Sequence, residues 1–171
     1  DHITGLGALR EQTGCKTMMG AQSVAKCLSG KFKGGDQLKA GEIQIEVIYS
    51  PGHTDDSYSF YIADKGILFS GDTLLIGGTG RTDFQNGDAA TQYDSLHSRI
   101  LSLPDSTMLY PAHDYNGVFS STLGNEKITN PRLQVIDKQA YIKLMESLDL
   151  PDPAMMDIAV SANQACGNLK S

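Results

Sequence analysis

Alternation of apolar and polar residues predicts a run of β-strands near the middle of the chain. Residues 43–49 read Ile-Gln-Ile-Glu-Val-Ile-Tyr, so apolar side chains recur at close to every second position. This period is typical of a strand with one buried face. Residues 57–62 and 66–70 are similarly apolar, and the stretch 64–66 between them predicts a tight hairpin turn. Two shorter strands are expected at residues 17–19 and 107–110.

Apolar residues spaced as on a helix face follow a glycine-rich loop at residues 77–80. From Tyr93 to Leu103 they recur every three or four positions, which places them along one side of a helix. Asp88 precedes this segment and is a suitable N-cap, because its carboxylate can accept a hydrogen bond from a free amide of the first turn. Further helices are expected at residues 3–13 and at residues 137–148, with Asp137 as the N-cap of the latter.

The order of these elements predicts an α/β fold in layers. Three strands, a loop, a helix and a further strand follow one another, which indicates a mixed sheet covered by helices rather than a doubly wound parallel sheet. Residues 31–35 are basic and rich in glycine, and we expect them to form a turn or loop. We expect residues 1–171 to form a single domain, because a chain of this length suffices for one hydrophobic core.

The composition is that of an ordinary globular protein, with 40% hydrophobic and 20% charged residues. A formal net charge of −6 argues against nucleic acid or an anionic membrane as the main partner. No apolar run approaches the roughly 18 residues of a membrane span. The three cysteines, Cys15, Cys27 and Cys166, form neither a disulfide framework nor a CxxC pair, which favours a reducing, intracellular compartment.

Three of the four histidines and one aspartate stand where predicted elements begin or end. His53, Asp72 and His113 each come directly after a predicted strand, close to turn-forming Gly or Pro residues, and His2 precedes the first helix. A single histidine in such a place is more often a surface or core residue, and we interpret His97, within a predicted helix, in that way. Taken together, imidazole and carboxylate groups at several strand ends indicate one site for a borderline divalent metal.

These positions resemble the metal-binding motifs of the metallo-β-lactamase superfamily. Asp1 and His2, with Ile-Thr-Gly after them, are similar to the end of its His-x-His-x-Asp-His motif, and His53, Asp72 and His113 match its three later metal-site positions in order. The resemblance implies an αββα sandwich with the metal site along one edge. It also implies that an N-terminal portion of the fold precedes Asp1, because the start of the motif is absent from the sequence.

Within this superfamily the chain is most similar to the persulfide dioxygenases, and the resemblance covers essentially the whole sequence. Its sharpest indicator is the segment Gly-Arg-Thr-Asp-Phe-Gln at residues 80–85. The family oxidises glutathione persulfide with O2, so the resemblance implies these two small-molecule substrates and sulfite as the oxidised product. Supporting similarities lie at residues 70–76, 110–115, 130–133 and 162–167.

The same resemblance implies one Fe(II) per chain, held by two histidines and one carboxylate. His53 and Asp72 match two of these ligands, and the third is expected upstream of Asp1. His113, Asp1 and His2 match positions for which the resemblance implies a catalytic role, orienting ligands or water by hydrogen bonds rather than holding a second metal. Zinc is the alternative metal.

Two residues match positions suited to binding the substrate. Arg81 could pair with a carboxylate of glutathione, and an ion pair with Asp83 is an equally good interpretation. Tyr115 could donate a hydrogen bond to the peptide or to a substrate sulfur, and the alternative is a tyrosine packed within its loop. Cys166 matches a family cysteine, which we interpret as structural or redox-sensitive rather than catalytic.

Two other functions stay open. A thioester hydrolase resembling glyoxalase II would act on lactoylglutathione with two metal ions and a bridging hydroxide, although residues 80–84 look unlike that branch and the stretch after His113 is short for its helical substrate domain. The other is a binding module or inactive fragment, which metal analysis would distinguish from both enzymes. The family resemblance implies the cytoplasm for a bacterial protein and the mitochondrial matrix for a eukaryotic one. The sequence does not decide between a monomer and a homodimer.

Overall fold

The computed structural model of the protein describes residues 2–135, 137–153 and 155–167. The chain divides into two compact units. Unit 1 consists of Asp1–Phe32 together with Asp149–Ser171, and unit 2 consists of Lys33–Leu148. The prediction that residues 1–171 form one domain stays a prediction.

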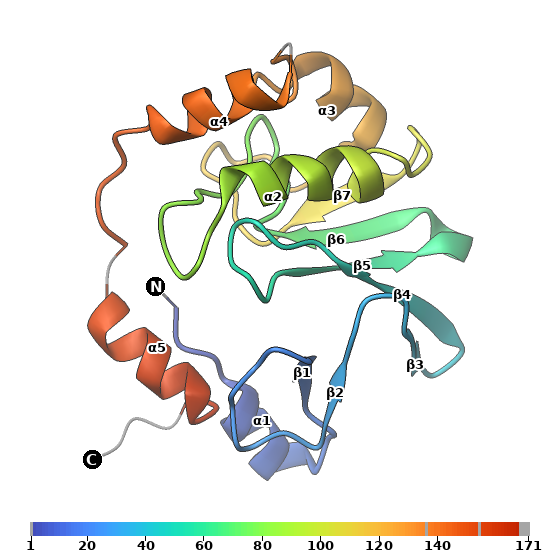
Figure 1. Cartoon of the computed structure of the whole chain (residues 1–171). Helices are drawn as coiled ribbons and strands as arrows, with labels where there is room; N and C mark the ends of the chain where they lie inside the picture. The colour runs from blue at the N-terminus through green and yellow to red at the C-terminus, as the bar shows by residue number, and fades with distance from the viewer. Residues whose placement is uncertain (1, 136, 154, 168–171) are drawn as a thin grey trace. The chain divides into compact units, whose positions relative to one another are not determined.

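Unit 2 contains a six-stranded sheet whose strands lie side by side in chain order, from β3 to β8 (Figure 1). Neighbouring strands are antiparallel, except for β6 and β7, which are parallel. The sheet is therefore mixed, as predicted from the order of the elements. The strands are β3 (Gln37–Ala40), β4 (Ile43–Tyr49), β5 (Tyr58–Ile62), β6 (Ile67–Gly71), β7 (Met108–Pro111) and β8 (Ser121–Thr122).

Three helices of unit 2 lie on one side of this sheet (Figure 1). The core between them is fully buried and contains Leu68 and Leu109 from the sheet, with Leu96, Leu123 and Tyr141 from the helical segments. Burial of such large apolar side chains is the main favourable contribution to folding. The helices are α2 (Ala89–Ser95), α3 (Leu123–Thr129) and α4 (Lys138–Glu146).

The predicted N-caps of α2 and α4 are confirmed. Asp88 accepts a hydrogen bond from the backbone N–H of Thr91 at 2.7 Å, and Asp137 accepts one from Ala140 at 2.8 Å. The helix that begins with α2 continues through Leu96–Ile100 as a π-helical turn, in which amides bond to carbonyls five residues back. The periodic apolar residues therefore face the core, although the last part of the predicted helix is wound more loosely.

Several short elements have too weak a sequence pattern to predict them. β3 is a four-residue edge strand in which only Leu38 is partly buried, so its alternation of polar and apolar residues is too short to indicate a strand. β2 (Gly30–Phe32) overlaps the stretch expected to form a loop; that expectation is wrong for these residues, because they pair with β1 (Met18–Gly20). No helix in the described part of the chain is both long enough and apolar enough to cross a membrane.

Unit 1 is built from both ends of the chain. α1 (Leu6–Thr13) begins later than predicted, because Gly5 offers no side chain to cap it and the Thr4 hydroxyl instead accepts the N–H of Leu6 at 3.2 Å. β1 and β2 follow and form a parallel pair. The C-terminal segment contributes α5 (Met156–Gln164).

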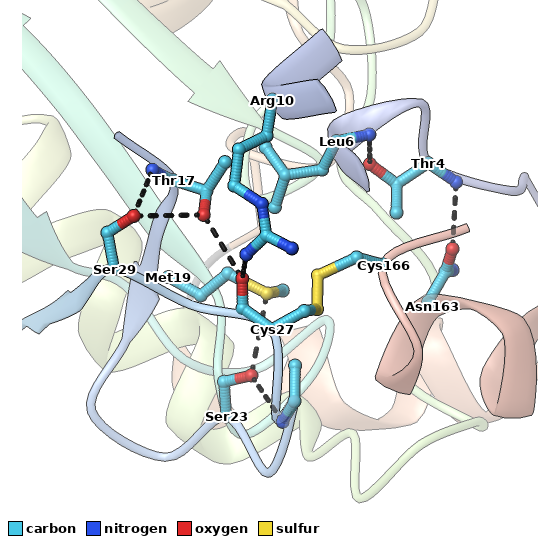
Figure 2. Close-up of a disulfide and its surroundings, with 11 residues drawn as sticks. Thr4, Leu6, Arg10, Thr17, Met19, Ser23, Cys27, Ser29, Asn163 and Cys166 are labelled. Carbon is cyan, nitrogen blue, oxygen red and sulfur yellow. Dashed lines mark hydrogen bonds between the residues drawn. A yellow bond between two sulfur atoms is a disulfide. The ribbon is translucent and has the colours of Figure 1, made fainter. Parts of the chain in front are cut away.

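A disulfide joins the two segments of unit 1 (Figure 2). It links Cys27 to Cys166 across 139 positions of the sequence, with their Cα atoms 6.2 Å apart. Cys15 is free. The interpretation of the three cysteines as reduced thiols is therefore wrong for two of them, because their spacing in the sequence does not reveal which distant pair the fold brings together.

Backbone contacts fix both cysteines (Figure 2). The carbonyl oxygen of Cys27 accepts hydrogen bonds from the Arg10 guanidinium and from the Thr17 hydroxyl, the latter at 3.2 Å. Cys166 is 2% exposed, and its carbonyl accepts the N–H of Gly7 at 2.9 Å. A Cβ on Gly7 would overlap that carbonyl oxygen, so glycine allows α1 to approach the end of α5 this closely.

Candidate metal centre

The three predicted site residues of unit 2 follow strands that end at the same edge of the sheet. β4 and β6 are both antiparallel to β5, and β7 is parallel to β6, so these three strands point the same way. His53 follows β4, Asp72 follows β6 and His113 follows β7. The topology therefore gathers three residues that lie far apart in the sequence, as expected from their places after strands.

The loop that carries His53 is fixed against helix α2. Gly52 has a φ of 141°, and a Cβ there would overlap the backbone of Gln92, so only glycine allows this contact. The carbonyl of Gly52 accepts the N–H of Asp88 at 2.8 Å, and the carbonyl of Pro51 accepts the Ser95 hydroxyl at 2.7 Å. The N-cap and the last residue of α2 thus hold both residues that precede His53.

The loop that carries Asp72 is closed by a second glycine contact. The backbone carbonyl of Asp72 accepts the N–H of Gly80 at 2.8 Å. A Cβ on Gly80 would overlap this carbonyl and would crowd the ring of His53. The close approach of residues 72 and 80 therefore requires glycine, and it places the next residue, Arg81, beside His53.

Buried hydroxyl groups connect the strand ends next to the site. The Oγ atom of Ser50 lies 2.9 Å from that of Ser59 and 3.0 Å from Oγ1 of Thr73. Ser59 also donates to the carbonyl of Ser70 at 3.3 Å. All four side chains are buried, and a buried hydroxyl is costly unless it is hydrogen-bonded. This network holds the ends of β4, β5 and β6 in register and so fixes the bases of both loops.

The side chains at the site converge on the Asp72 carboxylate. Nε2 of His53 lies 3.6 Å from Oδ2 of Asp72, and Nδ1 of His113 lies 2.6 Å from Oδ1. On its other side, Nδ1 of His53 lies 2.7 Å from the carbonyl oxygen of Arg81. Because a carbonyl can only accept, His53 donates from Nδ1, and the Nε2 lone pair is directed at Asp72.

The His53 and Asp72 donors fit a divalent metal. Ligand bonds of about 2.0–2.2 Å allow one ion to bind two donors up to about 4 Å apart, and the observed 3.6 Å lies within this reach. An unprotonated imidazole nitrogen and a carboxylate oxygen both present lone pairs, so a cation satisfies both. Within the described residues no group of three His, Cys, Asp or Glu side chains is placed to hold an ion, and these two form the donor pair of unit 2.

His113 is placed to orient the Asp72 carboxylate. Its Nδ1 hydrogen bond engages Oδ1 and leaves Oδ2 directed towards His53. The ring of His113 stacks on that of Tyr115, with centroids 6.1 Å apart. His2 lies in unit 1 with its carbonyl accepting from Asn163 at 2.9 Å, and the position predicted for Asp1 lies outside the described residues. The catalytic roles of His113, His2 and Asp1 stay predictions.

Arg81 forms an ion pair within its own loop. Its Nε and Nη2 atoms each lie 2.6 Å from an oxygen of Asp83, and its guanidinium covers the ring of Phe84 at 4.5 Å. The hydrogen bond from Arg81 holds the pKa of Asp83 below its usual value. The local ion pair named as one interpretation is therefore present, and the roles of Arg81 and Tyr115 in binding substrate stay predictions.

Three buried residues near the site were not singled out from the sequence. Gln92, Tyr141 and Thr79 are joined by hydrogen bonds, and the first two are completely buried. A signal for Gln92 was available, since it lies one helical turn before Leu96 on the apolar face of α2, where a polar side chain needs a buried partner. His97, in contrast, is exposed and packs on Tyr93, as predicted for a surface histidine.

Tyr141 gives the protein a predicted pH dependence of stability. Burial raises the pKa of Tyr141 to about 12, whereas an unfolded tyrosine titrates near pH 10. The raised pKa of Tyr141 contributes to the free energy of unfolding, and this contribution is complete below pH 10. It is lost as the pH rises from 10 towards 12, because in that range the unfolded state releases the phenol proton that the folded state retains. In urea unfolding between pH 9 and 12, we expect the wild type to lose about 2 kcal/mol more than Tyr141→Phe. Equal losses would show that Tyr141 titrates normally.

Comparison with known proteins identifies the superfamily to which the chain belongs. Residues 1–113 match the sequence profile of the metallo-beta-lactamase superfamily. The chain belongs to the metallo-β-lactamase superfamily. The predicted fold class, with its mixed sheet and covering helices, is confirmed.

Individual members of the superfamily are similar to the chain over most of its length. The chain is 45% identical to the mitochondrial persulfide dioxygenase ETHE1 of Mus musculus over 98% of its own length and 65% of that protein. The crystal structure of ETHE1 from Myxococcus xanthus superposes with a TM-score of 0.94 at 43% identity, covering 98% of this chain and 73% of that one. A hydroxyacylglutathione hydrolase of Brucella ovis is 32% identical over 94% of this chain and 63% of that protein. The chain thus spans less than two thirds of the length of either of these two curated relatives.

Proposed function

We propose that the protein is a persulfide dioxygenase, which oxidises the terminal sulfur of glutathione persulfide to sulfite with O2. The observation that carries this proposal is the bond from the His53 imidazole to the Arg81 carbonyl. It ties the metal-binding edge of the sheet to the loop segment at residues 80–85 that resembles the persulfide dioxygenases. The 45% identity to the mouse enzyme supports the same choice.

The residues of unit 2 have distinct tasks in this proposal. His53 and Asp72 would hold one Fe(II) per chain, which would supply the redox chemistry for O2 and sulfur. His113 keeps the Asp72 carboxylate oriented through its 2.6 Å hydrogen bond. The partial exposure of the three side chains, between 20% and 29%, leaves them accessible to a small molecule.

Two further residues would bind the substrate. Arg81 can offer its guanidinium to a glutathione carboxylate if the carboxylate replaces or joins Asp83, because Arg binds carboxylates through two parallel hydrogen bonds. Tyr115 is 80% exposed and stacked on His113, so its hydroxyl is available to the peptide part of the substrate. Catalytic roles for Asp1 and His2 belong to the same proposal.

Oxygen uptake with glutathione persulfide tests the proposal. With iron bound, we expect one O2 and one water to be consumed per persulfide, with release of one sulfite and one glutathione, and no hydrolysis of lactoylglutathione. Both assays are run on one preparation after metal analysis. Hydrolysis without oxygen uptake, together with two zinc ions per chain, would instead assign the protein to the hydrolases. A chain that binds no metal would support the non-enzymatic alternative.

The compartment follows from the same proposal. The mouse relative is named as a mitochondrial protein, so a eukaryotic source would place this protein in the mitochondrial matrix and a bacterial source in the cytoplasm. Fractionation of the source cells, with immunodetection of the protein, tests this assignment. Recovery of the protein outside the expected compartment would contradict it.

A further inference from the structure

A buried polar network clamps the loop that leads to Arg81. The side-chain amide of Gln92, on α2, donates to the carbonyl of Gly80 at 3.1 Å. Its carbonyl oxygen accepts the hydroxyl of Tyr141, on α4, at 2.7 Å. The Tyr141 oxygen lies 3.0 Å from the hydroxyl of Thr79. Thr79 and Gly80, the two residues before Arg81, are therefore both attached to the helices.

This clamp is connected to His53 along two paths. Through the loop, fixing Gly80 fixes the next peptide, whose Arg81 carbonyl accepts the Nδ1 proton of His53 at 2.7 Å. Through the backbone, α2 at Gln92 packs directly against Gly52, the residue before His53. Gln92 thus contacts both the segment that carries the imidazole and the segment that carries its hydrogen-bond acceptor.

We propose that Gln92 is a positioning residue for His53, holding the Gly80–Arg81 segment so that the imidazole keeps its proton on Nδ1 and directs the Nε2 lone pair at the metal position. This inference rests on the proposed function only in taking His53 as a metal ligand. Gln92 and Tyr141 are both completely buried. They would therefore act on the site through the residues that they hold in place, and not by touching a metal ion or a substrate.

The chemistry of the amide explains why glutamine suits this position. Gln92 must donate to a backbone carbonyl and accept from a phenol at the same time, and a side-chain amide offers one group for each task. An apolar residue of the same size would fill the space but would leave the Gly80 carbonyl and the Tyr141 hydroxyl without these partners. Hydrogen bonds that hold the second ring nitrogen of a ligating histidine set its tautomer and its affinity for metal.

The test combines two measurements on Gln92→Met, whose side chain is unbranched and similar in size but has no amide. The first is the tautomer of His53 in the metal-free protein, read from long-range 1H–15N correlations of the imidazole ring. The second is the dissociation constant for Co(II), used as a spectroscopic probe of the site. Tyr141→Phe removes the hydroxyl that orients Gln92 and serves as a second variant if Gln92→Met does not fold.

A matched control separates positioning from loss of stability. Leu148 is partly buried against the same core but takes no part in the network, so Leu148→Ala lowers the thermal midpoint without touching the clamp. We expect wild type and Leu148→Ala to show the Nδ1–H tautomer alone. Gln92→Met should show a mixture of tautomers and bind Co(II) about tenfold more weakly.

The outcomes distinguish this inference from the proposed function. A single Nδ1–H tautomer in Gln92→Met, with Co(II) affinity equal to that of Leu148→Ala, overturns the positioning role. If the wild type itself binds no Co(II) while the tautomer still changes in Gln92→Met, the positioning of His53 stands and the proposed metal function falls.

Discussion

Asp72→Ala is expected to lose bound metal and to abolish oxygen uptake with glutathione persulfide. The substitution removes the carboxylate on which both histidines converge, leaving His53 as the remaining donor in unit 2. Because loss of residues that merely support ligands already costs about 10- to 100-fold in metal affinity, we expect a loss of more than about 100-fold here. Metal content by mass spectrometry and the dissociation constant for Co(II) measure this effect.

A surface aspartate provides the control for Asp72→Ala. Asp105 is paired with Lys127 and its side chain is 71% exposed, so Asp105→Ala removes the same charge without reaching the site. We expect this variant to retain wild-type metal content and turnover. If Asp72→Ala also retained its metal and full turnover, the metal centre would have to lie elsewhere.

Cys27→Ser is expected to lower the free energy of unfolding by about 2–4 kcal/mol. The disulfide joins positions 139 residues apart, and without it the unfolded chain gains the conformational freedom that this long closed loop restricts. Urea unfolding monitored by circular dichroism measures the change, and Cys166→Ser should have a similar effect. Reducing the disulfide of the wild type with dithiothreitol should lower its free energy of unfolding by the same amount as either substitution.

The unpaired cysteine supplies the control for this prediction. Cys15 is free, so Cys15→Ser replaces the same atom without opening a crosslink, and we expect its unfolding curve to match the wild type. If Cys15→Ser and Cys27→Ser unfolded at the same urea concentration, the disulfide would make no contribution to stability.

The parts of the fold that were predictable have a regular local pattern. The helix beginning at Asp88 shows a stripe because Leu96 and Ile100 face the core. β4 was predicted from its alternating apolar residues, although its neighbouring residues Val47 and Ile48 are both buried, on opposite faces of the sheet. Both N-caps were predictable for a local reason, since an aspartate bonds to an amide three residues ahead. In these elements the local sequence already reports the tertiary environment.

The parts that were not predictable depend on contacts between distant residues. The three residues of β2 are held by pairing with β1 rather than by any pattern of their own. The pairing of Cys27 with Cys166 is equally invisible, because sequence spacing carries no information on which cysteines meet. For the candidate site, the residue types and strand ends predicted His53 and Asp72, whereas the contacts of Gln92 depend on where α2, α4 and the loop at residues 79–81 meet.

The composition of unit 1 from Asp1–Phe32 and Asp149–Ser171 has a consequence for synthesis on the ribosome. Proteins emerge from their N-terminal end, and compact regions fold once all of their residues are available. Unit 2 is continuous, whereas unit 1 is complete only after α5 has been synthesised. During that interval Cys27 is a thiol without its partner, so the disulfide forms only after Cys166 has emerged.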